Sequence, residues 1–378
     1  MTMRFALATT FYPPWSFGGD GIQVQRLARA LAARGHEVTV VHSREGYTAL
    51  GGDEHPPADR DGDVRLVAID AGRVSPTVTY LTGRPLLARP QLAAALADDF
   101  DVVHFHNPSL LGGPAALALG DGIKLYTAHE QWLVCPMHVL WQDRRRVCEQ
   151  PHCVRCSLRH RRPPQPWRAT GLLARSVREL DALIVPSATS ARLHARFAGD
   201  VRIEELPHFV EDPGETAPPS DHPRPYVLFA GRLADIKGPA TLPDAFRELP
   251  GVDLLIAGTG ELEPEIRARA AGLPNVRLLG WVDAGGLDAL YRGALAAVVP
   301  SVGHESFGLV PVEAFARGTP ALVRDFGALA EFVALAPCAI GYRTTSELTE
   351  AVAELAREPR RRQELGAVAR RTYLERFR

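Results

Sequence analysis

The chain has 378 residues, of which 46% are hydrophobic and 23% charged, a composition typical of a globular protein with material for two domains. Its 43 basic and 44 acidic residues leave a net charge of −1, which gives no general attraction to nucleic acid or to an anionic membrane. No apolar run approaches the ~20 residues of a membrane-spanning helix, and the first residues turn polar too early for a signal peptide. We therefore expect a cytoplasmic enzyme or binding protein.

Apolar strand-like runs alternate with helical patterns along most of the chain. After the first run, apolar residues at helical spacing fill positions 22–31, and Gly35 ends that helix before the next run. Such alternation favours parallel sheets with helices on both faces. The predicted strands are 5–8, 38–41, 64–69, 102–105, 123–127, 183–185, 201–206, 226–230, 254–257, 276–279, 296–299, 321–323 and 339–342.

The alternation pauses in a stretch rich in proline and glycine between positions 207 and 225. We therefore predict an α/β protein of two Rossmann-like, doubly wound domains, residues 1–206 and 222–378, joined by a linker at 207–221. The first domain carries a cysteine-rich insert at about 131–166. Ligands of such sheets bind outside the carboxyl ends of the strands, so two such edges facing each other across a cleft are the expected active site.

The sharpest motif follows the predicted strand at 296–299. A loop with glycines at 303 and 308 leads into a helix that begins near position 309, where free backbone amides and the helix dipole favour an anion. Glu305 precedes this helix and Glu313 lies inside it, about 10 Å away at ~1.5 Å per helical residue. That separation exceeds the ~5–5.5 Å of a retaining hydrolase's carboxylate pair. It suits a long ligand in which each carboxylate binds a different hydroxyl-bearing part. A solvated Glu305 and a surface Glu313 are the alternative.

A second motif follows the predicted strand at 226–230. Gly231 and Arg232 come at the end of that strand, and Lys237 and Gly238 open the next helix. The planar fork of arginine and the point charge of lysine can together neutralise a diphosphate. Of the 43 basic residues 41 are arginines, so a lysine in this loop suggests a site that needs an ammonium group. The alternative is that a lysine occurs at this position by chance.

Together with Gly-Thr-Gly at 258–260 and Gly-Trp-Val at 280–282, these motifs resemble the donor domain of the family 4 glycosyltransferases. Those are retaining enzymes of the GT-B fold. Phe-Tyr-Pro-Pro at 11–14, Gly-Gly at 18–19 and Asp-Val-Val-His-Phe-His at 101–106 are similar to the family's first domain. The resemblance therefore covers nearly the whole chain.

The resemblance implies transfer of a sugar from a nucleotide-diphosphate sugar to an acceptor hydroxyl, with retention and without a catalytic metal. It places the diphosphate at Arg232 and Lys237, the hydroxyls of the donor sugar at Glu305 and the ribose at Glu313. It also matches His129 to a histidine beside the reacting sugar. The other residues that it brings to the donor are Gly18, Gly19, Gly258, Val282, Ser306, Phe307, Gly308, Leu309 and Val310.

The first domain is expected to bind the acceptor. Glycines at 18, 19 and 21 let the backbone approach a ligand closely where the first helix begins, although a plain turn is the alternative. Asp20 lies in this loop, and the resemblance places the loop near the donor's β-phosphate and the acceptor. His129 follows the strand at 123–127, and His106 ends another strand and is the weaker candidate for an acceptor contact.

Four of the five cysteines fall within 22 residues, and the fifth, Cys338, lies in an apolar run and is expected in the core. The closing Cys-x2-Cys is a common metal knuckle, and four thiolates satisfy a closed tetrahedral zinc site without catalytic chemistry. Disulfides, free thiols and an iron–sulfur cluster are the alternatives, and His138 or His152 could replace one thiol. The predicted zinc ligands are Cys135, Cys148, Cys153 and Cys156.

Arginines dominate residues 144–162, around these cysteines. This basic segment suits an acidic acceptor, a phosphorylated lipid carrier or a peripheral contact with the inner membrane face, or it is a solvated face. The acidic stretch at 59–63 is interpreted as a surface loop and not as a metal site.

Other functions remain open on the sequence. A nucleotide-sugar epimerase or hydrolase of the same fold would process its donor without an acceptor, and a non-catalytic nucleotide-sugar-binding protein would not turn it over. A phosphorylase would need a pyridoxal lysine, and the loop of Lys237 suits phosphate better. The cysteine insert departs from the family pattern, and so does the end of the chain at Arg378, before the helix that usually crosses back to the first domain. The nucleotide, the sugar and the acceptor are not specified.

Overall fold

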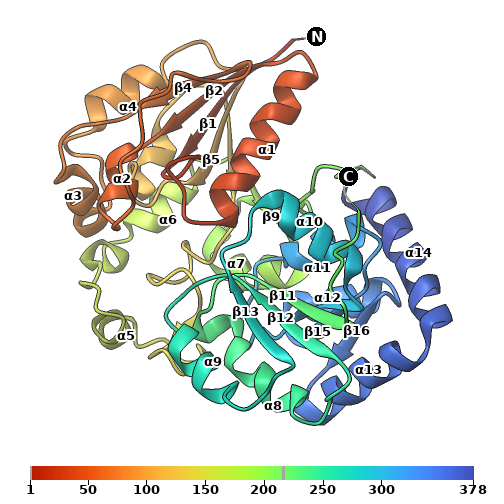
Figure 1. The fold of residues 1–378 in the computed structure, drawn as a ribbon. Helices are drawn as coiled ribbons and strands as arrows, with labels where there is room; N and C mark the ends of the chain where they lie inside the picture. Colours follow the sequence, from red (N-terminus) through yellow and green to blue (C-terminus); the bar gives the residue numbers. More distant parts are fainter. Residues whose placement is uncertain (1, 215–217) are drawn as a thin grey trace. The chain divides into compact units, whose positions relative to one another are not determined.

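The computed structural model describes residues 2–214 and 218–378, which form two compact units. Unit 1 comprises Met1–Asp143 with Gln150–Pro207, and unit 2 comprises Arg144–Glu149 with His208–Arg378 (Figure 1). The predicted linker at 207–221 includes residues 215–217, which lie outside the described residues. No helix of the described residues is long and apolar enough to cross a membrane.

Unit 1 is built on an eight-stranded sheet in the order β10-β9-β6-β5-β1-β2-β4-β3, parallel except for the pairing of β3 with β4. Its strands are β1 (Arg4–Thr9), β2 (Glu37–His42), β3 (Arg60–Asp61), β4 (Val64–Ala68), β5 (Val102–Asn107), β6 (Ile123–Thr127), β9 (Ala182–Val185) and β10 (Arg202–Glu205). Its α-helices are α1 (Gly19–Ala33), α2 (Arg44–Thr48), α3 (Ser75–Thr82), α4 (Arg89–Ala95), α5 (Cys153–Arg159), α6 (Leu172–Val177) and α7 (Ala188–Ala198), with 3-10 turns η1 (Pro114–Ala118) and η2 (Pro166–Ala169). The insert also holds the short strands β7 (Trp141–Gln142) and β8 (Arg146–Val147).

Unit 2 is built on a six-stranded parallel sheet in the order β13-β12-β11-β14-β15-β16. Its strands are β11 (Tyr226–Ala230), β12 (Asp253–Ala257), β13 (Val276–Gly280), β14 (Ala296–Val299), β15 (Ala321–Arg324) and β16 (Ala339–Tyr342). Its helices are η3 (Asp235–Lys237), η4 (Pro239–Thr241), α8 (Leu242–Phe246), α9 (Glu263–Arg269), α10 (Ala284–Gly293), α11 (Leu309–Ala316), α12 (Ala328–Leu335), α13 (Thr345–Arg357) and α14 (Pro359–Arg376).

Both faces of the unit 2 sheet are buried, which explains why its strands are continuous apolar runs. In β11 the side chains of Val227 and Phe229 join one hydrophobic cluster, and those of Tyr226 and Leu228 join another. Successive side chains of a strand point to opposite faces, so each face needs its own apolar set. Figure 1 shows helices on both faces of this sheet. The predicted fold class of two doubly wound α/β domains is confirmed.

The acidic stretch at 59–63, interpreted as a surface loop, is exposed except at Asp61, which is half-buried, but it is not wholly a loop. Residues of this stretch form β3, which pairs antiparallel with β4. The carboxylate of Asp61 accepts hydrogen bonds from Tyr12 Oη at 2.8 Å, Gln25 Nε2 at 2.9 Å and Arg29 Nη2 at 2.7 Å. Asp61 therefore fastens helix α1 and the turn after β1 to the edge of the sheet, a role that depends on partners more than 30 residues away.

We expect Asp61→Asn to lower the free energy of unfolding by about 1–2 kcal/mol at pH 7, because hydrogen bonds to a charged group are lost. Burial acts to raise the pKa of Asp61, but the bonds from Arg29, Gln25 and Tyr12 outweigh it and the pKa is lowered. A lowered carboxyl pKa stabilises the fold above its unfolded value of about 4, and that stability is lost as the pH falls through the folded pKa.

Urea unfolding of both proteins at pH 7 and near pH 3 measures this. The difference between wild type and Asp61→Asn should shrink at the lower pH. Asp59→Asn, at an exposed position of the same stretch, is the matched control and should change little. A constant difference at both pH values would contradict the role of the charge.

Candidate active site

In unit 2 the loops after β11 and β12 are fastened to each other by backbone contacts. The amide of Gly231 donates to Ala257 O at 3.0 Å, and that of Leu233 donates to Thr259 O at 2.9 Å. A Cβ on Gly258 would lie 1.9 Å from Gly231 O, and its φ of +139° favours glycine. The glycine at 258 thus serves close approach of two backbones, and this approach positions the Arg232 loop at the carboxyl edge of the sheet.

The loop that carries Lys237 lies against the end of β14. Gly238 has a φ of +66°, and a Cβ there would lie 2.3 Å from Pro300 O. The amide of Val302 donates to Ile236 O at 2.9 Å. These contacts join the two loops that the sequence singled out, whose charged residues Lys237 and Glu305 are 68 positions apart in the chain.

Lys237 and Glu305 meet in a charged pair. Lys237 Nζ lies 2.6 Å from Glu305 Oε1 and 2.8 Å from Oε2, and Ser301 Oγ donates to Oε1 at 2.5 Å. Burial acts to raise the pKa of Glu305, but Lys237, Ser301 and the charge of Arg232 together lower it. Lys237 and Glu305 therefore meet at one edge of the unit 2 sheet, where Glu305 is ionised, and the charge of Arg232, an exposed residue of the loop after β11, acts on the same carboxylate.

Helix α11 begins at this edge. Gly308 is its N-cap with a φ of +114°, and no side chain of the described residues caps the helix, so the first amides are open toward an anion. Glu313 lies inside α11, where Tyr291 Oη donates to its Oε2 at 3.3 Å. The Phe307 side chain is buried in the core, so this residue could offer a ligand only backbone groups. The side chains of Leu309 and Val310 are half-buried and pack against the same core. Ser306 lies in the same loop.

The loop after β13 presents one exposed and one half-buried side chain. Trp281 is 75% exposed, and Val282 packs against the core beside Leu287 and Leu290. An exposed indole next to the carboxyl end of a strand offers an aromatic face to a ligand.

In unit 1 the candidate residues lie at the carboxyl ends of the neighbouring strands β1, β5 and β6. Gly18 is the N-cap of α1, Gly19 is its first residue and Asp20 lies in its first turn. Asn107, the last residue of β5, donates from Nδ2 to Asp20 Oδ2 and to Glu130 Oε1, each at 3.0 Å. One amide thus holds the glycine-rich turn and the residue after His129 together.

Three histidines line the same edge. His129 Nε2 and His106 Nδ1 share a hydrogen bond of 2.8 Å, and their rings stack with centroids 5.1 Å apart. Because the His106 side chain is only 1% exposed, it contacts His129 and positions the ring of that residue. His104 bonds Thr127 Oγ1 at 2.7 Å, and burial lowers its pKa to about 3, which keeps it neutral.

Sequence reasoning missed several residues of both edges. Ser301 and Asn107 bond to candidate residues, Asn107 also bonds Glu130, and His138, considered from the sequence only as a zinc ligand, bonds Glu130 as well. The position of Asn107 and Glu130 directly after His106 and His129 was a signal that could have found them. Ser301 and His138 had no such signal, because their partners depend on how the loops fold.

The four clustered cysteines lie in the insert around α5. Cys135 and Cys156 are buried, Cys148 is half-buried and Cys153 is exposed. The described residues contain no group of three or more histidine, cysteine, aspartate or glutamate side chains placed to hold a metal ion. His138, an alternative ligand, instead bonds through Nδ1 to Glu130. Cys338 is fully buried in the core, as expected.

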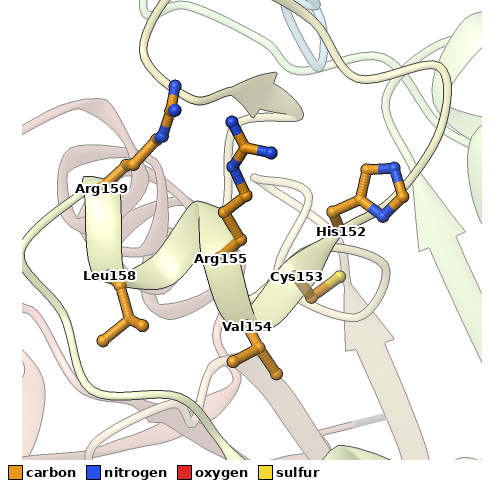
Figure 2. A pocket seen from close by; sticks show the side chains of 6 residues that line it. All are labelled: His152, Cys153, Val154, Arg155, Leu158 and Arg159. Carbon is orange, nitrogen blue, oxygen red and sulfur yellow. The ribbon is translucent and has the colours of Figure 1, made fainter.

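Helix α5 presents a mixed surface, shown in Figure 2. Val154 and Leu158, one turn apart, are 62% and 60% exposed, and Arg155 and Arg159 form the next row of the helix. These four residues line an open pocket with His152 and Cys153 (Figure 2).

Comparisons with known proteins cover most of the chain. The model of Glycosyltransferase Family 4 matches residues 17–213, and that of Glycosyl transferases group 1 matches residues 215–372. A phosphatidyl-myo-inositol mannosyltransferase of Mycobacterium leprae is 30% identical over 336 residues, which cover 83% of this chain and 78% of that protein. A glycogen synthase of Mycobacterium tuberculosis is 30% identical over 361 residues, covering 88% and 80%.

Solved structures agree on the fold. Sucrose-phosphate synthase from Thermosynechococcus elongatus has a TM-score of 0.75 at 20% identity, covering 99% of this chain and 95% of that one. HepE of Anabaena, in complex with UDP and glucose, has a TM-score of 0.68 at 16% identity with the same coverage. The chain therefore belongs to the family 4 glycosyltransferases, with two Rossmann-like domains of the GT-B type.

Proposed function

We propose that this glycosyltransferase takes its sugar from a nucleotide-diphosphate sugar and passes it to an acceptor hydroxyl with retention, without a catalytic metal. The observation that carries the proposal is the contact of Lys237 with the ionised Glu305, where the charge of Arg232 acts on the same carboxylate. Two cations beside one ionised acid match a ligand that has a diphosphate at one end and hydroxyls at the other.

In this proposal unit 2 binds the donor. Arg232 and Lys237 would neutralise the diphosphate, with the open amides at the start of α11 beside them. Glu305 would accept hydrogen bonds from the sugar hydroxyls and Glu313 from the ribose, and the loop at 281–282 would meet the base. The solved relatives of the same fold that carry UDP, glucose or UDP-glucose support a donor of this class.

Unit 1 would bind the acceptor and support the reacting centre. His129, oriented by His106, would donate a hydrogen bond or stabilise charge at the reacting sugar. The leaving diphosphate would take the proton of the acceptor hydroxyl on the face where the sugar–phosphate bond breaks. The protein then contributes orientation and fixed charges and moves no proton through a base of its own. Transfer should therefore persist in EDTA.

A hydrolase or epimerase of the same fold would form product from the nucleotide sugar without an acceptor. A non-catalytic binding protein would form no product. Thermal-shift screening against UDP-, GDP-, ADP- and dTDP-sugars identifies the donor, and product analysis with and without acceptors separates these classes. Binding followed by acceptor-dependent transfer supports the proposal, and release of free sugar alone contradicts it.

The basic segment at 144–162 is proposed to contact a membrane peripherally through α5. Arg144 bonds Glu261 at 2.6 Å within unit 2, and Arg159 lies 3.3 Å from Asp143, so part of its charge is neutralised internally. The support lies instead in the exposed pair Val154 and Leu158, because apolar side chains rimmed by arginine suit the headgroup region of anionic lipid.

The cysteine spacing is the sole support for a structural zinc ion, which stays a proposal. A closed site would hold the insert together and leave no open position for chemistry. Because the described residues do not place three ligands around one point, zinc binding would require these side chains to draw together.

We expect Glu305→Gln to lower kcat/KM for transfer by about ten- to hundred-fold, because a charged hydrogen bond to the donor is lost and Lys237 is left unpaired. Steady-state kinetics with the identified donor measure this. Glu248→Gln, at an exposed position of unit 2, is the matched control. Full transfer activity in the Glu305 variant would contradict the donor site.

We expect Leu158→Ser with Val154→Ser to reduce binding to vesicles of phosphatidylglycerol and phosphatidylcholine by at least threefold, because buried apolar area is lost. Co-sedimentation measures the bound fraction. Leu374→Ser, which removes a 42% exposed leucine on α14, is the control. Equal binding of wild type and double variant would exclude α5 as the contact.

Elemental analysis of the purified protein tests the metal. One zinc per chain, lost in Cys153→Ser and Cys156→Ser, is expected if the thiols are ligands. Cys338→Ser, which alters only the core cysteine, should keep the metal. Absence of zinc together with four titratable thiols would end the proposal.

A further inference from the structure

A hydrogen-bonded row in unit 1 lies beside His129 and has no role in the donor chemistry. Its members are Asp20, Asn107, Glu130 and His138. We infer that Glu130 and Tyr126 form, with Asp20, a subsite for vicinal hydroxyls of a neutral sugar or cyclitol, and that the acceptor carries no anionic group there. The inference rests on the proposed function, since it identifies the ligand as the acceptor.

Asn107 orients both carboxylates. It is 2% exposed, and its Oδ1 accepts from Ser109 Oγ at 2.6 Å and from the Ser109 amide at 3.3 Å. Nδ2 is therefore the end that points to the carboxylates, and it gives one hydrogen to Asp20 Oδ2 and one to Glu130 Oε1. The amide is fully used by these four bonds and works as a positioning group.

His138 directs the remaining oxygen of Glu130. Its Nδ1 lies 2.6 Å from Glu130 Oε1, the same oxygen that Asn107 bonds. Within the described part of the chain, Glu130 Oε2 has no hydrogen-bond partner, and the side chain is 26% exposed. His138 holds this geometry from a left-handed backbone with φ of +69°, fastened by its carbonyl to the Gln131 amide at 2.9 Å. One carboxylate oxygen is thus saturated and the other is left for a ligand.

Buried polar groups beneath Glu130 provide independent evidence of a missing partner. Tyr126 is fully buried, and its hydroxyl has no hydrogen-bond partner among the described residues. The charges of Glu130, Arg168 and Asp20 act on this phenol, in that order, and Tyr126 lies on β6 only four residues before Glu130. In the same residue set the side-chain amide of Gln131, 1% exposed, also lacks partners. Buried polar groups of native proteins are bonded to protein, water or ligand, so these groups point to a polar molecule.

The charge around the subsite selects the ligand. Neither Asp20 nor Glu130 forms an ion pair with an arginine or lysine of the described chain, and both bond the same amide nitrogen. Their negative charge attracts hydroxyl or ammonium donors and repels phosphate or carboxylate. The one cation that acts on Tyr126, Arg168, is engaged by Gln165 Oε1 and by the backbone carbonyls of Trp132 and Leu133. Glu130 directly follows His129, so a diol bound at Glu130 lies next to the histidine proposed to face the reacting sugar.

Binding of three matched probes tests the inference: myo-inositol, an inosamine that carries an ammonium group, and a myo-inositol phosphate. Dissociation constants come from ligand-observed NMR titration of the full chain. We expect the neutral and ammonium probes to bind at least tenfold more tightly than the phosphate. Glu130→Gln should weaken the neutral probe about tenfold, and Tyr126→Phe about three- to tenfold.

Tyr126→Phe separates a ligand contact from a structural role. Removal of an unsatisfied buried hydroxyl should leave the melting temperature of the free protein unchanged or higher, while probe binding weakens. Glu37→Gln, which alters a 71% exposed carboxylate of unit 1, is the control and should change neither quantity. No binding to wild type, preference for the phosphate probe, or full binding by both variants would overturn the inference.

The two proposals fail separately. If nucleotide sugars bind and are turned over but the probes behave in one of the contradicting ways, only the hydroxyl subsite is wrong. If no nucleotide sugar binds or reacts, the proposed donor chemistry is wrong, whatever the probes show.

Discussion

Parallel strand order is the constraint on which both candidate sites depend. Each strand of a parallel sheet delivers its carboxyl end, and the loop that follows, to the same edge. In unit 2 this brings the loops after β11 and β14 together, so that Lys237 meets Glu305. In unit 1 the adjacent strands β1, β5 and β6 bring Asp20, Asn107 and Glu130 within bonding distance.

The two edges differ in how charge is balanced. At the unit 2 edge the ionised Glu305 is paired with Lys237, and the charge of Arg232 leaves the three groups with a net positive charge that suits an anion. At the unit 1 edge two carboxylates share a neutral amide, and burial, followed by the charge of Glu130, raises the pKa of Asp20. A phosphate suits the first edge and a hydroxyl donor the second, which is the division of labour that transfer from an activated sugar to an alcohol requires.

Glycine positions show how backbone packing supports these edges. Gly258 and Gly238 each lie where a Cβ would collide with a backbone carbonyl, of Gly231 and Pro300 respectively. Close contact between successive loops leaves their side chains little freedom, so the charged groups are held before a ligand arrives. Such preorganisation favours electrostatic stabilisation, because the charged groups need not be reoriented, at a cost in free energy, during the reaction.

The sequence by itself determined the elements and the classes of chemistry. Buried strands are apolar on both faces, so runs such as those of β11 and β14 are visible without coordinates, and glycine, lysine and glutamate in the loops after them indicated a diphosphate and hydroxyl site. The family resemblance followed from those same motifs. The cysteine spacing indicated ligand types, but metal geometry is a property of positions in space.

Only the tertiary structure decided which side chains become hydrogen-bond partners. Lys237 and Glu305 are 68 residues apart, and Asn107 and Asp20 are 87 apart, so their pairing depends on strand order and loop packing that no local pattern encodes. For the same reason Asp61, an acid in a polar stretch, proved to be an anchor for Tyr12, Gln25 and Arg29. Local sequence specifies which groups a residue can bond, while the fold specifies which of them come within 3 Å.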